Sequence, residues 1–282
     1  MAVIPLQNRG EINMDWARIK TIFIIAFLAL NIYLGYEFYK LYKSSQYDYI
    51  SEATIESQLS ADEIEIVSLP KNVSKGKYLT ASPKRFTKEE LAEMAEGRLN
   101  GQSVTIINDT VIESYLEKPY KISANFSPNE LAAFLKNNVI AGEEYSFWER
   151  DPVNNTITYY QKVNDKVLFN NMNGELTFYL NEDNEIVYYR QTLLEDFEEF
   201  PDEETLLQPI KAIEILYENG KIPSGSKITK IEEGYYTLVH LSSSQVLTPV
   251  WRVVLNGEKD LYVNAVEGQI VELENVEKKI LE

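Results

Sequence analysis

The longest apolar stretch of the chain is residues 21–39, which contain a single charged residue. A helix rises about 1.5 Å per residue, so this stretch approaches the ~30 Å thickness of the hydrocarbon core of a bilayer. Basic residues lie on both sides of it and aromatic residues cluster near its ends, as is typical of segments anchored at a membrane interface. The pattern predicts one transmembrane helix over residues 21–40, preceded by an N-terminal segment, 1–20.

Two other interpretations of this stretch are a cleaved signal peptide and a buried core helix. A signal peptide has a shorter apolar core that is followed by a cleavage site of small residues. The residues that follow here, GYEFYKLYKSSQY, contain no such site. A core helix of a soluble protein is rarely apolar around its whole circumference. The membrane anchor is therefore the favoured interpretation.

The residues after the anchor begin with a polar and charged segment, 41–60, which predicts a stalk. Three helices are then predicted. The first begins at Thr87, which with Glu90 forms a capping box. The second spans 127–138 and has Pro128 at its first helical position. The third spans roughly 203–219 and ends at a glycine.

Strands are predicted wherever apolar and polar residues alternate. Pairs such as Asn173-Gly174, Glu233-Gly234, Asn256-Gly257 and Glu267-Gly268 predict the turns between them. The predicted strands are residues 63–69, 103–109, 110–116, 144–150, 155–163, 174–181, 185–193, 227–233, 235–241, 248–255, 260–265 and 269–274.

The order of a helix followed by antiparallel strands occurs twice, over 127–193 and over 203–274. This order predicts an α+β fold in which helices pack on antiparallel sheets, with a duplicated helix-plus-sheet unit. We expect an N-terminal lobe over 61–193 and a C-terminal lobe over 194–282, both extracytoplasmic.

The charge of the chain is strongly acidic, with 27 basic and 44 acidic residues and a net charge of −17. The whole of this acidic excess lies after residue 43, which favours a cytoplasmic N-terminus and an extracellular C-terminal domain in the cell membrane. An acidic domain is repelled by nucleic-acid phosphates, so no nucleic-acid partner is expected. The chain contains no cysteine, which excludes disulfides and thiolate chemistry.

The sequence contains no recognisable catalytic constellation, and we predict no enzymatic activity, cofactor or metal. The only histidine, His240, lies in an alternating segment and has no second histidine or cysteine to complete a zinc site. The acidic run 195–204 lacks the ligand spacing of an EF-hand and is interpreted as a solvated linker. A pair of catalytic carboxylates is not singled out among so many acids.

One face of the predicted membrane helix carries two unusual residues, Asn31 and Gly35. An amide is costly in hydrocarbon unless it finds a partner, and a glycine lets another helix approach closely. One hypothesis is a contact face for a partner helix, and the other is an asparagine tolerated without a partner. The face would consist of Ile24, Phe27, Leu28, Asn31, Gly35 and Phe38.

A family resemblance begins at Met14, where Met14-Asp-Trp-Ala-Arg-Ile-Lys precedes the apolar run. This start resembles that of the YycI (WalI) proteins of low-GC Gram-positive bacteria. The capped helix, the tyrosine-rich hairpins and the Pro-x-Trp-Arg-Val strand, residues 249–253, are also similar. The usual start of the family leaves Met1 and Met14 as alternative first residues.

The resemblance implies an α+β extracellular domain with repeated sheet-and-helix units and an accessory, non-catalytic role. It implies a membrane protein that acts with a YycH-like partner to regulate the essential sensor histidine kinase WalK (YycG), which controls cell-wall metabolism. It also implies that contact with the kinase lies largely in the membrane helices.

Two other function classes stay open. One is an extracytoplasmic module that binds or hydrolyses cell-wall glycans, which would need a cleft with two carboxylates, one of raised pKa. The other is a folding or secretion chaperone, which would bind unfolded chains with little sequence preference.

Overall fold

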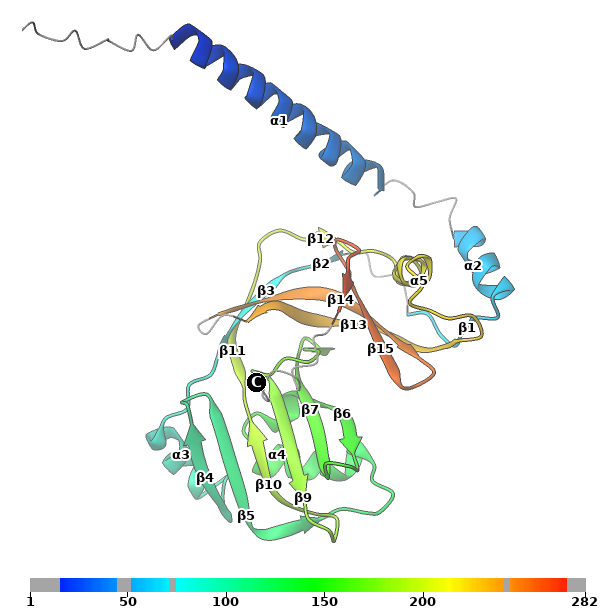
Figure 1. Ribbon diagram of the computed structural model, residues 1–282. Helices are drawn as coiled ribbons and strands as arrows, with labels where there is room; N and C mark the ends of the chain where they lie inside the picture. The colour runs from blue at the N-terminus through cyan, green and yellow to red at the C-terminus, as the bar shows by residue number, and fades with distance from the viewer. Residues whose placement is uncertain (1–15, 45–51, 71–74, 241–243, 273–282) are drawn as a thin grey trace, which may run out of the picture. The chain divides into compact units, whose positions relative to one another are not determined.

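The computed structural model describes residues 16–44, 52–70, 75–240 and 244–272 (Figure 1). The chain forms two compact units, residues 1–58 and residues 59–282. The first unit contains helix α1 (Trp16–Ser44), and helix α2 (Glu52–Ala61) spans the boundary between the units. The segment expected to be a stalk is therefore helical in part.

The second unit is built on two large sheets, each of seven strands. The order of the first is β4-β5-β10-β9-β7-β6, all antiparallel, with short β8 paired to β7. Its strands are β4 (Gln102–Ile107), β5 (Val111–Lys121), β6 (Tyr145–Asp151), β7 (Thr156–Val163), β8 (Lys166–Val167), β9 (Glu175–Leu180) and β10 (Glu185–Gln191).

Helix α4 (Ala132–Asn138) covers one face of this sheet (Figure 1). The 3-10 turn η1 (Pro128–Leu131) leads into it, and the capping box of Ser127 and Glu130 closes its start. Buried Phe134 of α4 packs edge-on against Phe178 of β9, with ring centroids 5.8 Å apart. The strand alternation places Leu176, Phe178 and similar residues on this covered face, where they form the larger core.

The second sheet has the order β1-β13-β14-β15-β16, and β3 joins it beside β14 and carries β11. Helix α5 (Pro209–Glu218) packs against β14 and β15. The pair β1–β13 is parallel, whereas the other pairs are antiparallel. The strands are β1 (Glu65–Ile66), β3 (Leu79–Pro83), β11 (Leu194–Glu199), β13 (Lys227–His240), β14 (Gln245–Leu255), β15 (Lys259–Asn264) and β16 (Ile270–Val271).

The predicted α+β class and the repeated order of a helix before antiparallel strands are confirmed. Helix α4 precedes β6 to β10, and α5 precedes β13 to β16. Helix α3 (Lys88–Ala95) begins after the predicted N-cap Thr87, whose hydroxyl accepts a hydrogen bond from the Glu90 N–H at 3.2 Å.

The predicted turn at Glu233-Gly234 is wrong, because β13 runs through it without a break. A Cβ atom at Gly234 would lie 2.3 Å from Cε2 of Phe169 and 2.6 Å from the carbonyl oxygen of Val167. This glycine lets the segment after β8 approach β13, where Leu168 bridges Tyr235. Close packing, not turning, explains the glycine.

The acidic run 195–204 is also not a linker as predicted. Its first half forms β11, which pairs with β3, and Glu204–Thr205 forms β12, which pairs with Lys75–Gly76 in β2. As a consequence, the third helix begins at Pro209 instead of near residue 203. Pairing with strands more than a hundred residues away outweighs the local preference of acidic residues for a helix start.

Candidate functional site

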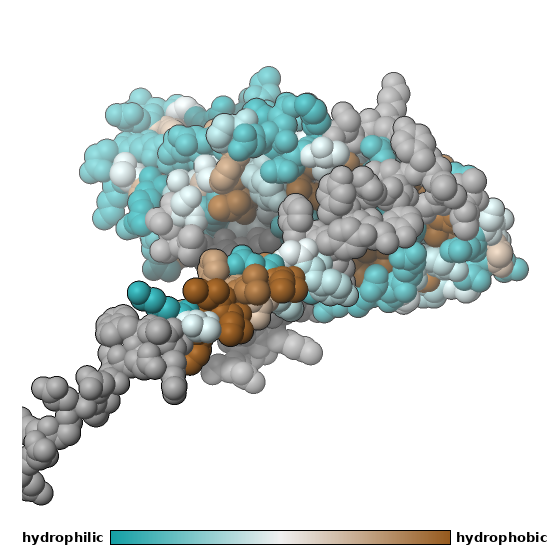
Figure 2. Space-filling view, turned by 90° about the horizontal axis from the view of Figure 1, so that it is seen from above, coloured by the Kyte–Doolittle hydropathy of each residue, from teal (hydrophilic) through white to brown (hydrophobic). Residues whose placement is uncertain are grey.

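The predicted partner-contact face lies on α1. The segment Lys20–Glu37 of this helix is long and apolar enough to cross a membrane once. Residues spaced three, four and seven apart lie on one helical face, and Ile24, Phe27 and Leu28 are each at least 59% exposed within the chain. Figure 2 shows apolar side chains gathered on α1, in contrast to the mainly hydrophilic visible face of the second unit. The side chain of Phe38 lies outside the described residues.

Asn31 satisfies part of its hydrogen-bonding capacity within its own helix. Its amide nitrogen donates to the carbonyl oxygen of Phe27 at 2.8 Å. This bond lowers the cost of placing the amide in hydrocarbon, and its side-chain carbonyl keeps acceptor capacity for a partner. Apart from the backbone of the helix itself and the neighbours of Gly35 in the chain, no atom of the described residues lies within 4 Å of the position that a Cβ of Gly35 would occupy. The face is therefore open at its smallest residue, and its role as a contact face stays a prediction.

The acidic run 195–204 is matched by three lysines, of which Lys75 lies in β2, Lys77 lies between β2 and β3, and Lys84 directly follows β3. The ammonium groups of Lys75, Lys77 and Lys84 lie 2.8 to 3.1 Å from the carboxylates of Glu203, Glu199 and Glu195, respectively. Lys84 also pairs with Glu90 at 3.0 Å. Burial, the largest effect, would lower the pKa of Lys84, but the hydrogen bonds that its ammonium donates to Glu90 and Glu195 raise it overall. These pairs hold an acidic segment in a sheet, which sequence reasoning did not predict.

The Pro-x-Trp-Arg-Val strand lies in β14 and has a structural role. Trp251 is fully buried, and its indole N–H donates to the carbonyl oxygen of Leu207 at 2.9 Å. Arg252 points to the other face, where it pairs with Glu232 of β13 and with Asp260 of β15. Burial would lower the pKa of Arg252, but hydrogen bonds to Asp260 and Glu232 raise it, so the guanidinium stays charged.

No group of three or more potential metal ligands occurs among the described residues. His240 lies at the end of β13, and its side chain is outside the described residues. Burial raises the pKa of Glu175, which accepts a hydrogen bond from the hydroxyl of Thr177 at 2.9 Å. Burial alone accounts for the raised pKa, since the hydrogen bond from Thr177 lowers it, and no second carboxylate contributes, so the shift does not favour a hydrolase.

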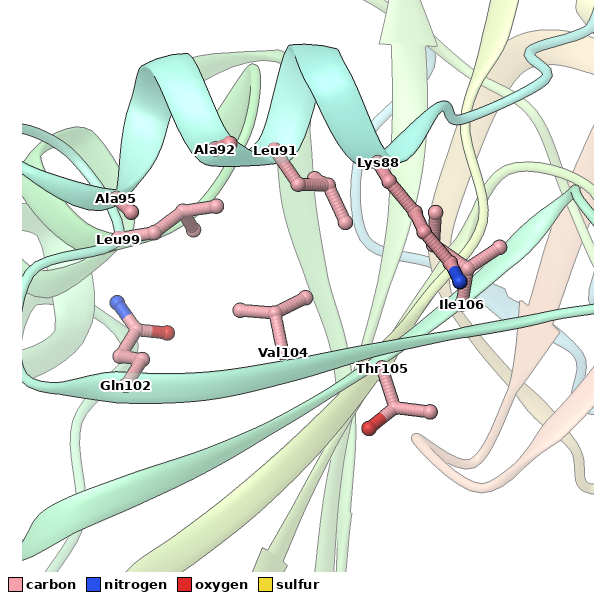
Figure 3. Close-up of a pocket in the computed structure, with 9 residues that line it drawn as sticks. All are labelled: Lys88, Leu91, Ala92, Ala95, Leu99, Gln102, Val104, Thr105 and Ile106. Atoms are coloured by element: carbon pink, nitrogen blue, oxygen red, sulfur yellow. The ribbon is translucent and has the colours of Figure 1, made fainter.

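A pocket of about 520 Å³ lies between α3 and the edge strand β4 (Figure 3). Leu91, Ala92 and Ala95 of α3 face Val104 of β4 across it, and Leu99 closes one end. No carboxylate lines this pocket, and Lys88 is its only charged residue. Sequence reasoning missed it, although two exposed alanines on the apolar side of a short helix are the local signal of such a space.

Comparisons with known proteins give three similar solved structures and one matching family model. The chain is similar to an uncharacterized protein from Eubacterium rectale (12% identity, TM-score 0.43, 78% of this chain and 99% of that chain covered). It is similar to the C-terminal domain of Bacillus megaterium YpeB (12%, TM-score 0.39, 68% and 100%). It is also similar to YycH from Bacillus subtilis (14%, TM-score 0.36, 67% and 52%). No curated protein gives a significant match. The model of the family described as YycI protein matches residues 44–266, which is most of the chain. The chain therefore belongs to the YycI family.

Proposed function

We propose that this chain is a membrane-anchored accessory regulator of a WalK/YycG-type sensor histidine kinase that controls cell-wall metabolism. The observation that carries the proposal is the YycI family match over residues 44–266, which begins where the apolar helix α1 ends. Membership in this family supports a regulatory accessory role. In this proposal a YycH-like membrane protein is the second partner, and the chain has no catalytic function of its own.

Regulation passes through the membrane helices in this proposal. A regulator shifts a kinase between two states only if it contacts one state more favourably than the other. The face with Asn31 and Gly35 suits such a contact, because the glycine permits close approach and the asparagine side-chain carbonyl can still accept a hydrogen bond. Ile24, Phe27, Leu28 and Phe38 would supply the apolar packing around these two residues.

The proposed orientation places the N-terminus in the cytoplasm and residues 59–282 outside the cell, attached by a single membrane pass. The acidity of the second unit supports this topology, whereas the lysines near both ends of α1 favour neither orientation. Cysteine-accessibility labelling tests it, since the chain has no natural cysteine. A single cysteine introduced at exposed Val153 should react with an impermeant maleimide in intact cells, and labelling only after lysis would contradict the topology.

The helix-face hypothesis is tested with the substitutions Asn31→Leu and Gly35→Leu in the full chain. We expect either change to alter kinase output and to weaken co-purification of the kinase. A matched control is Ile32→Leu, which changes an apolar residue next to Asn31 on a neighbouring part of the helix surface. Unchanged output and unchanged co-purification in both test variants would refute the helix-face contact.

The wider proposal is tested by a membrane pull-down with the full chain as bait, compared with the chain lacking α1. Recovery of a sensor kinase only with α1 supports regulation through the membrane. Full regulatory activity of the chain without α1 would overturn the membrane mechanism, and turnover of a cell-wall glycan by the purified chain would overturn the non-catalytic assignment.

A further inference from the structure

Strand β4 is an edge strand with one unpaired side. It is the first strand in the order of the first sheet, and within the described residues no strand pairs with its other edge. The N–H of Glu117 donates to the carbonyl oxygen of Gly101 at 2.9 Å, so this pair is a hydrogen-bonded one. Such pairs alternate with non-bonded pairs along an antiparallel ladder. The backbone groups of Val104 and Ile106, which lie opposite Ser114 and Ile112, therefore point away from β5.

The same two residues line the pocket beside α3. The side chains of Val104 and Ile106 lie on the face that α3 overhangs, and Leu91, Ala92 and Ala95 approach from the helix (Figure 3). Ala92 and Ala95 are exposed, because their small side chains do not fill the space above the strand. The unpaired backbone edge and the apolar slot thus lie side by side along one strand.

The charge at the mouth of the slot adds a further constraint. Lys88 is the only charged lining residue, it is exposed, and it forms no ion pair with any described residue. An unpaired ammonium beside an apolar slot complements a ligand that carries a carboxylate next to apolar side chains. Gln102 closes the far end, since its side chain is already bonded to Ser114, Tyr189 and the carbonyl oxygen of Asn138.

We propose that the slot between α3 and β4 binds an extended segment of another polypeptide by strand addition. The segment pairs with the backbone of Val104 and Ile106, inserts apolar side chains at alternate positions into the slot, and places a carboxylate near Lys88. Backbone hydrogen bonds supply affinity in this mode, and the pocket beside the strand selects side chains. This peptide site is separate from the contact face on α1, so an experiment can refute one of the two proposals without refuting the other.

The probe is a phage-displayed library of short random peptides selected against the full chain in detergent micelles. Enriched peptides are synthesised with a fluorophore, and binding is measured by fluorescence anisotropy. We expect alternating apolar residues and an acidic residue among them. Ala92→Trp fills the slot and should weaken binding at least about tenfold. Glu93→Trp, the adjacent exposed position that does not line the slot, is the matched control and should leave affinity unchanged.

Two further variants separate the backbone contribution from the side-chain contribution. Ile106→Pro removes an outward-pointing N–H without breaking the ladder to β5, and should weaken binding by about tenfold as well. Lys88→Glu should weaken binding of the acidic peptides. Circular dichroism of each variant confirms that the fold is retained. An empty selection, or equal binding by both tryptophan variants, overturns the proposal. Self-association that Ala92→Trp abolishes would overturn it too, because a second copy would then be the occupant.

Discussion

The guanidinium carbon of Arg252 lies 4.1 Å from the ring centroid of Trp148, over the face of the indole. Trp148 belongs to β6 of the first sheet, and Arg252 belongs to β14 of the second. The same arginine is held by Glu232 and Asp260 from the strands on either side of it. One cation therefore joins the two sheets by stacking and by ion pairs.

Arg252→Ala is expected to destabilise the second unit by about 3 kcal/mol or more, because it leaves two carboxylates without a counter-charge in a largely buried site. Only 15% of the Arg252 side chain is exposed. Urea unfolding of the full chain, followed by far-UV circular dichroism, measures the change. Arg252→Lys keeps the positive charge but loses the planar guanidinium, so the loss of stability should be smaller than for Arg252→Ala. An equal cost for both substitutions would show that geometry, and not charge, dominates.

Gly234→Ala should destabilise the chain by about 2–3 kcal/mol, because its methyl group would overlap Phe169 and a backbone oxygen. Gly97→Ala is the matched control and should be nearly neutral, since the nearest atom to its Cβ would be 3.8 Å away. The double variant Gly234→Ala with Phe169→Leu should lose less stability than the sum of the stabilities lost by the two single variants. Strict additivity in thermal unfolding would contradict the close-approach explanation.

Glu175→Gln should raise the melting temperature at neutral pH. Burial raises the pKa of Glu175, so the folded state pays a cost for the charged carboxylate that the unfolded chain does not. Stability attributable to this group therefore falls as pH rises from the ordinary value near 4.5 to the raised one. The gain from Glu175→Gln should disappear well below pH 4.5. If the rise in melting temperature caused by Glu175→Gln grew on acidification, a raised pKa of Glu175 would be contradicted.

Glu130→Gln should lower stability at neutral pH, where Glu175→Gln should raise it, and is therefore the control for Glu175→Gln. Hydrogen bonds from the Ser123 hydroxyl, the Ser123 N–H and the Ser127 N–H lower the pKa of Glu130. The stability that this carboxylate contributes is present above its ordinary pKa and is lost as pH falls through the lowered one. The loss of stability caused by Glu130→Gln should therefore be seen at neutral pH and should vanish in acid.

Lys84→Met should cost more stability than Lys75→Met. The Lys84 side chain is 17% exposed and holds two carboxylates, whereas the Lys75 side chain is 64% exposed and holds one. An exposed ion pair contributes about 0–1 kcal/mol and is screened by salt. Denaturation in low and high salt compares the two, and a salt-sensitive loss of equal size in both variants would contradict the difference in burial.

The sequence alone determined the elements whose signals are local. Contiguous apolar residues predict α1, because a membrane-spanning helix satisfies its backbone hydrogen bonds internally and needs no partner segment. The caps at Thr87 and Ser127 act within one helical turn, so the starts of both helices follow from a few residues. The strands of the first sheet follow from alternation, since each has one face in the core and one towards solvent.

Only the tertiary structure decided the features that depend on distant segments. Gly234 predicts a turn until Phe169 is seen to pack against it. The acidic run 195–204 predicts a linker until β3 and the lysines that flank β3 are seen to pair with it. The pocket beside β4 likewise depends on where α3 ends up above that strand. The reason is physical: local sequence sets the conformational preference of each segment, whereas burial and strand pairing between segments far apart in the chain set which preference prevails.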